Sequence, residues 1–152
     1  MTLKIGDKAP AFALPDHTGA VRSLTDWQGQ WVLLYFYPKD DTPGCTTEAC
    51  SLRDNLPKFS GLNAAVIGIS VDSAKSHAKF VKKCGLPFTL LADEDKSVCQ
   101  EYGVWGEKKF MGRNFLGIKR SSFLIDPSGK VAKIYENVKP AEHAAQVLAD
   151  IQ

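Results

Sequence analysis

An uninterrupted apolar run near the start of the chain, Trp31 to Tyr37, constrains the fold more than any other feature of the sequence. It lacks the alternation of a half-exposed strand, and a continuous run of this kind is typical of a strand buried on both faces. Pro38 ends it, because proline cannot donate to a strand ladder. A second run, Ala64 to Val71, has the same character. Two such strands predict a parallel sheet covered by helices.

Helical patterns alternate with these strands. We predict a helix from Pro43 to Leu56 that stops at Pro57, and another from a Ser73 cap to Cys84 that stops at Gly85. An amphipathic pattern over 140–151 predicts a last helix. Strands that alternate with helices indicate parallel pairing with right-handed crossovers.

Shorter elements complete the predicted order. They are a hairpin from Ala11–Leu14 and Val21–Leu24, a strand at Thr89–Leu91, a short helix at Lys96–Tyr102, and a second hairpin from Ser121–Ile125 and Val131–Tyr135. We interpret the stretch with Trp105, Phe110 and Met111 as loop-like, with side chains that fill the core rather than line a substrate rim. The order predicts one α/β domain over residues 1–152, with thioredoxin-like topology, an N-terminal β-hairpin extension and a central mixed sheet flanked by helices. A flavodoxin-like sheet is the competing topology, but it lacks the hairpin before the last helix.

Composition excludes several classes of protein. A chain of 152 residues that is 44% hydrophobic can bury a core without a disulfide scaffold or a metal. Its net charge of +2, without a block of like charge, gives no case for nucleic-acid binding. The longest apolar run is far shorter than the roughly 20 residues that span a membrane, and the first ten residues are charged where a signal peptide would be apolar. We therefore expect a cytoplasmic protein without a membrane partner.

The chain has four cysteines: Cys45, Cys50, Cys84 and Cys99. In a cytosolic chain they favour catalytic, metal-binding or inert roles over structural disulfides. Their spacings of 5, 34 and 15 do not fit a zinc knuckle or ribbon, so we expect no metal site.

Cys45 lies where a helix is predicted to begin. Thr42 suits the N-cap and Pro43 the first helical position, which places Cys45 in the first turn. Unpaired N–H groups and the helix dipole favour a thiolate there, and the thiolate is the reactive form. The segment also follows a buried strand, at the edge of an α/β sheet where ligands bind. A small hydrophobic role for Cys45 would not need the Thr-Pro-Gly lead-in.

The neighbouring residues remove several kinds of cysteine chemistry. Thr42 stands where a Cys-x-x-Cys exchanger has its first cysteine, and Ser51 stands where a cysteine phosphatase needs arginine. A protease needs a histidine base, and we expect the three histidines, His17, His77 and His143, to lie on the surface. Thiol redox chemistry without a Cys-x-x-Cys pair remains.

The pattern Pro38-x-x-x-Thr42-x-x-Cys45 resembles the peroxidatic motif of the peroxiredoxins, and residues 46–50 resemble their bacterioferritin comigratory protein, or Q-type, branch. The resemblance extends to residues 35–38, 88–91, 103–108 and 120–126 and covers nearly the whole chain. It implies hydroperoxide substrates, a dithiol reductant such as thioredoxin, a monomeric protein and an antioxidant role. It also implies that the enzyme works without a metal, haem or flavin cofactor.

The resemblance implies a role for each motif residue. Cys45 would attack the O–O bond and become a sulfenic acid, Arg120 and Thr42 would stabilise the transition state, and Pro38 would shield the pocket. A fixed guanidinium fork aimed at developing charge is a physically sound donor. Thr42 could also be a helix cap, and the sequence does not separate the two roles.

The other cysteines are assigned on the same basis. Cys50 would resolve the sulfenic acid, while some members of the branch use a cysteine on the following helix, which keeps Cys84 as an alternative. We expect Cys99 to be buried and inert.

The spacing of Cys45 and Cys50 has a geometric consequence. Five residues apart in one α-helix, their Cα atoms would be about 8.6 Å apart, whereas a disulfide needs roughly 7 Å or less. The helix must therefore unwind before these residues can bond.

Two other functions remain open at this stage. A redox-regulated binding protein or chaperone would use the cysteines only to sense oxidant, and a non-catalytic thioredoxin-fold module would not use them. An enzyme would consume many equivalents of hydroperoxide, whereas a sensor would consume about one.

Overall fold

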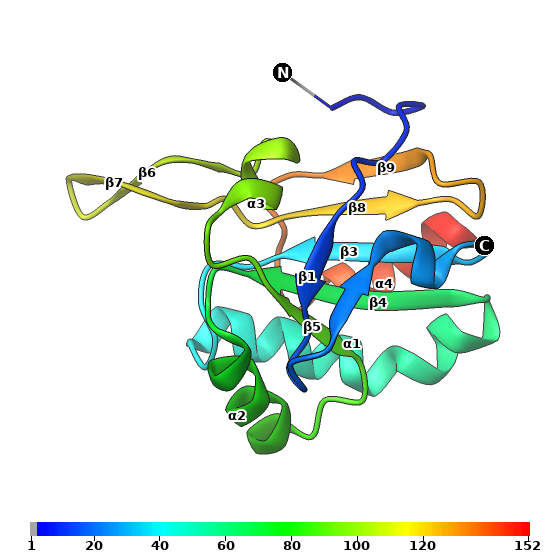
Figure 1. Cartoon of the computed structure of the whole chain (residues 1–152), viewed down its shortest axis with the longest axis horizontal. Coiled ribbons are helices and arrows are strands. Elements are labelled where there is room, and N and C mark those ends of the chain that lie inside the picture. The colour runs from blue at the N-terminus through cyan, green and yellow to red at the C-terminus, as the bar shows by residue number, and fades with distance from the viewer. Residues whose placement is uncertain (1–2) are drawn as a thin grey trace.

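A five-stranded mixed sheet forms the centre of the molecule (Figure 1). The computed structural model describes residues 3–152, apart from the side chain of Phe110. The strand order is β5-β4-β3-β8-β9. The strands are β3 (Trp31–Phe36), β4 (Ala64–Ser70), β5 (Thr89–Ala92), β8 (Ser121–Ile125) and β9 (Val131–Tyr135). β3 pairs parallel with β4 and β4 with β5, while β8 pairs antiparallel with both β3 and β9, which confirms the predicted mixed sheet.

Apolar side chains cover both faces of the sheet. On β3, Leu33 and Tyr35 join a cluster with residues of α1 (Pro43–Gly61), α2 (Ala74–Cys84) and α4 (His143–Ile151). Val32 and Leu34 face a second cluster, built from the N-terminal arm and α3 (Ser97–Glu101). Successive residues of a strand point to opposite faces, so a strand buried on both faces needs apolar residues at every position.

The N-terminal extension is the predicted hairpin. β1 (Ala13–Pro15) pairs antiparallel with β2 (Val21–Ser23), and the 3-10 helix η1 (Leu24–Trp27) follows. The side chain of Asp16 closes the turn, since its Oδ1 accepts from the backbone N–H of Thr18. The arm packs on the face of the sheet opposite α1 (Figure 1).

Helix boundaries are partly as predicted. Ser73 caps α2 by accepting from the Ser76 N–H, and Gly85 ends it in the left-handed conformation, as expected. α1, however, continues through Pro57 to Gly61. A proline removes one helical hydrogen bond, but Pro57 is exposed and the fully buried Phe59 holds the last turn on the core. α4 begins at His143, three residues later than predicted. Among residues 3–152, no helix is long and apolar enough to cross a membrane.

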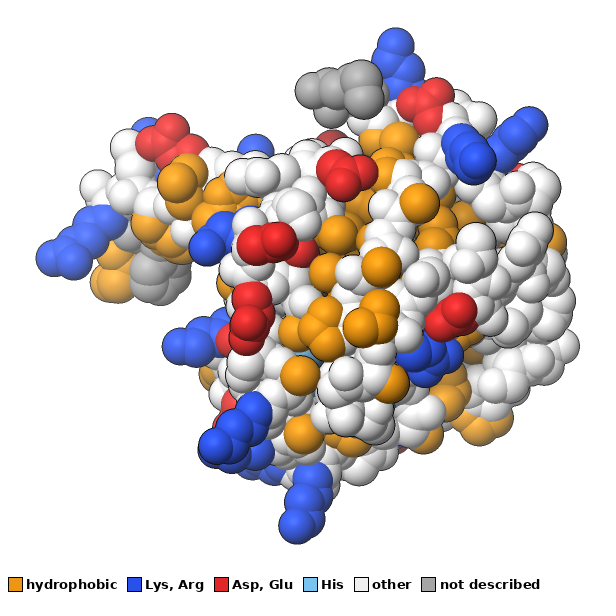
Figure 2. Space-filling model, in the orientation of Figure 1, with side chains coloured by type: hydrophobic (Ala, Val, Ile, Leu, Met, Phe, Trp, Pro, Cys, Tyr) orange, Lys and Arg blue, Asp and Glu red, His pale blue; other side chains and the backbone are white. Residues whose placement is uncertain are grey.

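A second hairpin, β6 (Trp105–Phe110) and β7 (Arg113–Ile118), was not predicted. It extends from the body of the molecule (Figures 1 and 2). Its strands therefore bury little apolar surface and lack a regular apolar pattern. Met111 at its tip is 87% exposed, so the core role expected for this residue is wrong, while Trp105 is half-buried. Met111 and Gly112 both have positive φ, which suits a two-residue hairpin turn without the usual Asn-Gly signal. The side chain of Phe110, part of the same prediction, lies outside the described residues.

Candidate active site

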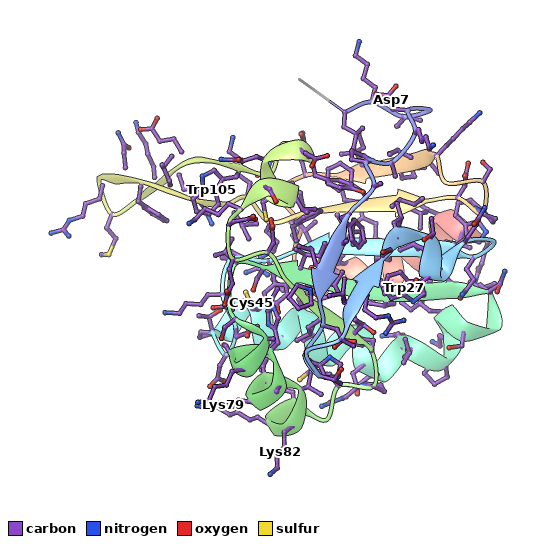
Figure 3. All side chains as sticks on the ribbon, viewed as in Figure 1. Asp7, Trp27, Cys45, Lys79, Lys82 and Trp105 are labelled. Atoms are coloured by element: carbon purple, nitrogen blue, oxygen red, sulfur yellow. The ribbon has the colours of Figure 1, made fainter. Side chains whose placement is uncertain are left out.

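Cys45 lies in the first turn of α1, on the same side of the molecule as the β6–β7 hairpin (Figure 3). Thr42 occupies the N-cap position with extended backbone angles and Pro43 follows inside the helix, as the sequence predicts. The Cys45 side chain is only 1% exposed. Its sulfur therefore sits at the positive end of a helix dipole in a largely desolvated position.

Arg120 contacts Cys45 directly. Its Nη2 donates to Sγ of Cys45 at 3.4 Å, and its Nη1 donates to Oε1 of Glu48 at 2.8 Å. Cys45 and Glu48 are three residues apart on α1 and so share one face of the helix. One guanidinium fork thus bridges a sulfur and a carboxylate and places a positive charge beside the sulfur.

The sheet brings Arg120 to this position. β3 and β8 pair so that Phe36 lies opposite Ser121. Arg120 directly precedes Ser121, at the end of β3 from which the chain leads to α1. The predicted partnership of Arg120 and Cys45 therefore follows from the antiparallel register of two strands.

Glu48 is a member of the site that the sequence analysis missed. Its side chain is completely buried and its Oε1 bonds to Arg120, while no described residue bonds to its Oε2. Burial raises the pKa of Glu48 to about 7, although Arg120 opposes this shift. Its helical spacing of three from Cys45 is the signal that could have identified it.

Gly44 makes room for the guanidinium. A Cβ atom at this position would lie 3.1 Å from Nη2 of Arg120, which is closer than most real Cβ contacts. From the sequence, Gly44 is predicted only as part of the helix start. The structure shows that it also lets Arg120 lie against the first turn of α1.

Pro38 and Thr42 belong to the loop that connects β3 to α1. The Thr42 hydroxyl makes no cap bond and instead donates to the carbonyl of Lys39 at 2.8 Å. Its hydrogen is therefore engaged, while its oxygen can still accept. Pro38 follows β3 directly and is half-buried.

A buried polar cluster fixes the loop of residues 38–42 against α2. Asp40 accepts from the hydroxyls of Tyr37 at 2.6 Å and Ser76 at 2.8 Å, and lies 2.7 Å from Nδ1 of His77. Burial alone would raise the pKa of Asp40, but the bonds from His77 and Tyr37 hold it below its ordinary value. The other ring nitrogen of His77 faces the carbonyl of Leu91 at 2.9 Å, an acceptor. Both ring nitrogens of His77 therefore face oxygen atoms, which fixes the ring between Asp40 and Leu91.

The same cluster contains three side chains of the types that bind metal ions. Ligand atoms of Asp40, Asp72 and His77 lie within 4.8 Å of one another. Asp72 accepts from the Asp40 N–H at 2.8 Å and from Ser70, and Asp40 and His77 bond to each other. Because their polar atoms are used within the protein, we interpret the cluster as a structural clamp on the loop.

The surface location expected for the histidines is wrong for two of the three. His77 and His143 are buried, and His143 Nε2 lies 2.8 Å from the Ser122 hydroxyl. Burial lowers the pKa of His143. Their hydrogen-bond partners do not include Cys45.

The four cysteines are free thiols. Cys50 lies further along the same unbroken helix as Cys45. Burial raises the pKa of the Cys84 thiol at the end of α2, and Cys50 is close enough to raise it further. Cys99 is fully buried, and burial and the neighbouring Asp93 raise its pKa, so its predicted burial is confirmed.

A cavity of about 520 Å³ lies elsewhere, beneath the N-terminal arm. Phe12, Trp27 and Val32 contribute to its lining and belong to the apolar cluster on the arm side of the sheet. Cys45 belongs to the cluster on the opposite face. The sheet thus separates this cavity from the sulfur of Cys45.

Known proteins are similar to this chain in both sequence and structure. The model of the AhpC/TSA family matches residues 5–134. Peroxiredoxin Bcp of Escherichia coli strain K12 is 51% identical over 146 residues, which cover 96% of this chain and 94% of that protein. A structure of a PrxQ mutant from Xylella fastidiosa has a TM-score of 0.93 and 37% identity, and the match covers 99% of this chain and 96% of that chain.

A third similar structure belongs to a protein that is described by an enzymatic activity. The structure of the bacterioferritin comigratory protein of Xanthomonas campestris, reported for its alkyl peroxide reduction activity, has a TM-score of 0.87 and 41% identity. The match covers 92% of this chain and 89% of that chain. The chain therefore belongs to the AhpC/TSA family and is a peroxiredoxin, a peroxidase enzyme with a thioredoxin-like fold.

Proposed function

We propose that this protein reduces hydrogen peroxide and organic hydroperoxides through the thiol of Cys45, in antioxidant defence. The observation that carries the proposal is the 3.4 Å bond from Arg120 to Sγ of Cys45 at the start of α1. The alkyl peroxide reduction activity of the Xanthomonas relative supports the substrate class.

The first step is attack by the Cys45 thiolate on the terminal oxygen of the hydroperoxide. The O–O bond breaks, Cys45 becomes a sulfenic acid, and the leaving alkoxide or hydroxide takes a proton from solvent. Arg120 donates to the developing charge, and loss of one such donor typically costs about 3 kcal/mol. Thr42, whose hydrogen goes to the Lys39 carbonyl, would accept from the hydroperoxide O–H. Pro38 would shield the pocket.

The second step returns the enzyme to its reduced state. Cys50 attacks the sulfenic sulfur, water leaves, and a Cys45–Cys50 disulfide forms, which a dithiol protein such as thioredoxin reduces. Because both cysteines belong to α1, the first turns of this helix must unwind. Cys84 remains the alternative resolving residue. We further propose a cytoplasmic monomer in which residues 1–152 form one domain, a view supported by two apolar clusters that share one sheet.

Two variants test the cycle. Cys45→Ser should keep the fold and lose thioredoxin-supported peroxidase activity, while Cys99→Ser, the matched control, should keep it. Cys50→Ser should still consume one equivalent of peroxide, but turnover should fall sharply and sulfinic acid should accumulate at Cys45. Substantial activity in Cys45→Ser would contradict the mechanism. Sustained turnover in Cys50→Ser would identify Cys84 as the resolving residue.

A further inference from the structure

Cys50 and Cys84 lie against each other where α1 packs on α2. Both side chains are half-buried. Burial raises the pKa of the Cys84 thiol, and Cys50 lies close enough to raise it further. Arg53, three residues after Cys50 on α1, donates from Nη1 to the backbone carbonyl of Cys84. This bond holds the last residue of α2 against the face of α1 that carries Cys50. The two cysteines are therefore neighbours in the folded, reduced protein.

Cys45 and Cys50 have the opposite geometry. They share the unbroken helix α1, in which a separation of five residues keeps their Cα atoms about 8.6 Å apart. A bond between them requires α1 to unwind. A bond between Cys50 and Cys84 would instead join two elements that already touch, and α1 could stay helical.

We propose that Cys84 completes a disulfide relay, in which its sulfur attacks Cys50 within the Cys45–Cys50 disulfide. This inference rests on the proposed peroxidase cycle. The Cys45–Cys50 bond breaks as the Cys50–Cys84 bond forms. Cys84 is oxidised and gives its proton to solvent, while Cys45 is reduced and leaves as a thiolate. No outside oxidant is needed, and the external dithiol then reduces the Cys50–Cys84 bond.

The structure favours the products of this exchange. Cys45 regains its place beside Arg120, a cation that stabilises the leaving thiolate. α1 can refold and bury Ala49 and Leu52 again, both fully buried in the reduced protein. The exchange thus releases the constraint that the first disulfide imposes on the helix.

The surroundings of Cys84 predict how the exchange depends on pH. Burial and the neighbouring Cys50 raise the pKa of the Cys84 thiol, Asp41 adds to this, and Lys83 opposes it. Arg53 on α1 is the other charged group that faces the pair. Since the thiolate is the attacking form, the exchange should become faster as the pH rises.

The relay has a stoichiometric consequence. Once the disulfide has moved to Cys50 and Cys84, the sulfur of Cys45 is free again and can react with a second hydroperoxide. The second sulfenic acid then has no resolving thiol. Without reductant, the protein should therefore consume two equivalents of peroxide before over-oxidation begins, whereas a protein without Cys84 should consume one.

The experiment uses the reduced full-length protein without reductant, treated with one or two equivalents of hydrogen peroxide. The wild type, Cys84→Ser and the control Cys99→Ser are quenched, alkylated and mapped by mass spectrometry, with dimedone to trap sulfenic acid. Trypsin alone leaves Cys45 and Cys50 in one peptide between Lys39 and Arg53, so a glutamyl endopeptidase is added to cut after Glu48.

We expect the wild type and Cys99→Ser to end with a Cys50–Cys84 bond and, after the second equivalent, dimedone on Cys45. Cys84→Ser should hold only a Cys45–Cys50 bond, without dimedone on Cys45. A wild type that retains Cys45–Cys50, or that pairs Cys45 with Cys84, overturns the relay but leaves the peroxidase cycle standing. If Cys45 consumes no peroxide in any of the three proteins, the proposed function fails, and the relay fails with it.

Discussion

Glu48 is completely buried, and it accepts a 2.8 Å hydrogen bond from the same guanidinium that contacts the sulfur of Cys45. Burial raises the pKa of Glu48 to about 7. Near neutral pH the carboxyl group is therefore partly protonated. Its protonation state decides how strongly it attracts Arg120, so we expect Glu48 to act as a positioning residue for that arginine.

Glu48→Gln should change how stability depends on pH. Between the ordinary glutamate pKa of 4.5 and about 7, the folded protein keeps a proton that the unfolded chain has lost. Stability contributed by Glu48 is therefore highest below pH 4.5 and falls as the pH rises to 7, by on the order of 3 kcal/mol if fully expressed. Glutamine removes this titration, so urea unfolding should show the variant gaining stability relative to the wild type between pH 5 and pH 8. Parallel pH profiles of the two proteins would show that Glu48 does not titrate in this range.

Arg120→Lys should slow oxidation of Cys45 more than it destabilises the fold. Lysine keeps the charge but lacks the fork that reaches both Cys45 and Glu48, and loss of a transition-state donor typically slows a reaction about 10²–10³-fold. The melting temperature, measured at pH 6, should change little, because a Glu48 that loses its partner can take up a proton. Arg113→Lys, on the exposed hairpin, is the control. An unchanged rate with peroxide would show that the guanidinium fork of Arg120 does not assist the reaction.

Gly44→Ala should separate helix stability from reactivity. Alanine favours the helix, but its Cβ would lie 3.1 Å from Nη2 of Arg120 and displace the guanidinium by a few tenths of an ångström. We expect the rate of Cys45 oxidation to fall on the order of tenfold, or about 1.4 kcal/mol, with no loss of thermal stability. Gly61→Ala, in the last turn of the same helix, meets nothing within 4 Å and should react like the wild type. Equal rates for both variants would contradict the close fit at Gly44.

Hydrogen exchange should detect the unwinding of α1. The Cys84→Ser variant, oxidised to the Cys45–Cys50 form, should lose amide protection over about residues 42–54, and reduction should restore it. The reason is the Cα separation of about 8.6 Å in an intact helix. Equal protection of residues 47–53 in both forms, with the disulfide confirmed, would show that the helix accommodates the bond.

The sequence determined the elements whose signals are local. Ser73 and Gly85 predicted both ends of α2, and Thr42 with Pro43 placed Cys45 in the first turn of a helix, because caps and turns depend on residues a few positions apart. The run from Trp31 to Tyr37 predicted a strand buried on both faces. Successive side chains of a strand point to opposite faces, so apolar residues at every position require both faces to be covered. Family resemblance added Arg120, Thr42, Pro38 and Cys50.

Local signals failed where packing against distant residues decides the outcome. α1 passes through Pro57 because the buried Phe59 anchors the turn beyond it. His77 lies on α2, a helix with several lysines, and its sequence surroundings indicate an exposed position. It is nevertheless buried, because Asp40 and the carbonyl of Leu91 satisfy both of its ring nitrogens. The β6–β7 hairpin was not predicted from the sequence. Its strands extend into solvent, so they do not need the alternating apolar residues by which a strand is recognised.

Only the tertiary structure joined residues that are far apart in the sequence. The register of β3 and β8 places Arg120 beside Cys45, 75 positions away, and the packing of α1 on α2 places Cys50 beside Cys84. Backbone preferences act over a few residues, whereas these contacts depend on which strand edges pair and which helix faces bury their apolar side chains. The sequence thus set the position of Cys45 in the first turn of a helix, and the folded sheet decided which groups surround its sulfur.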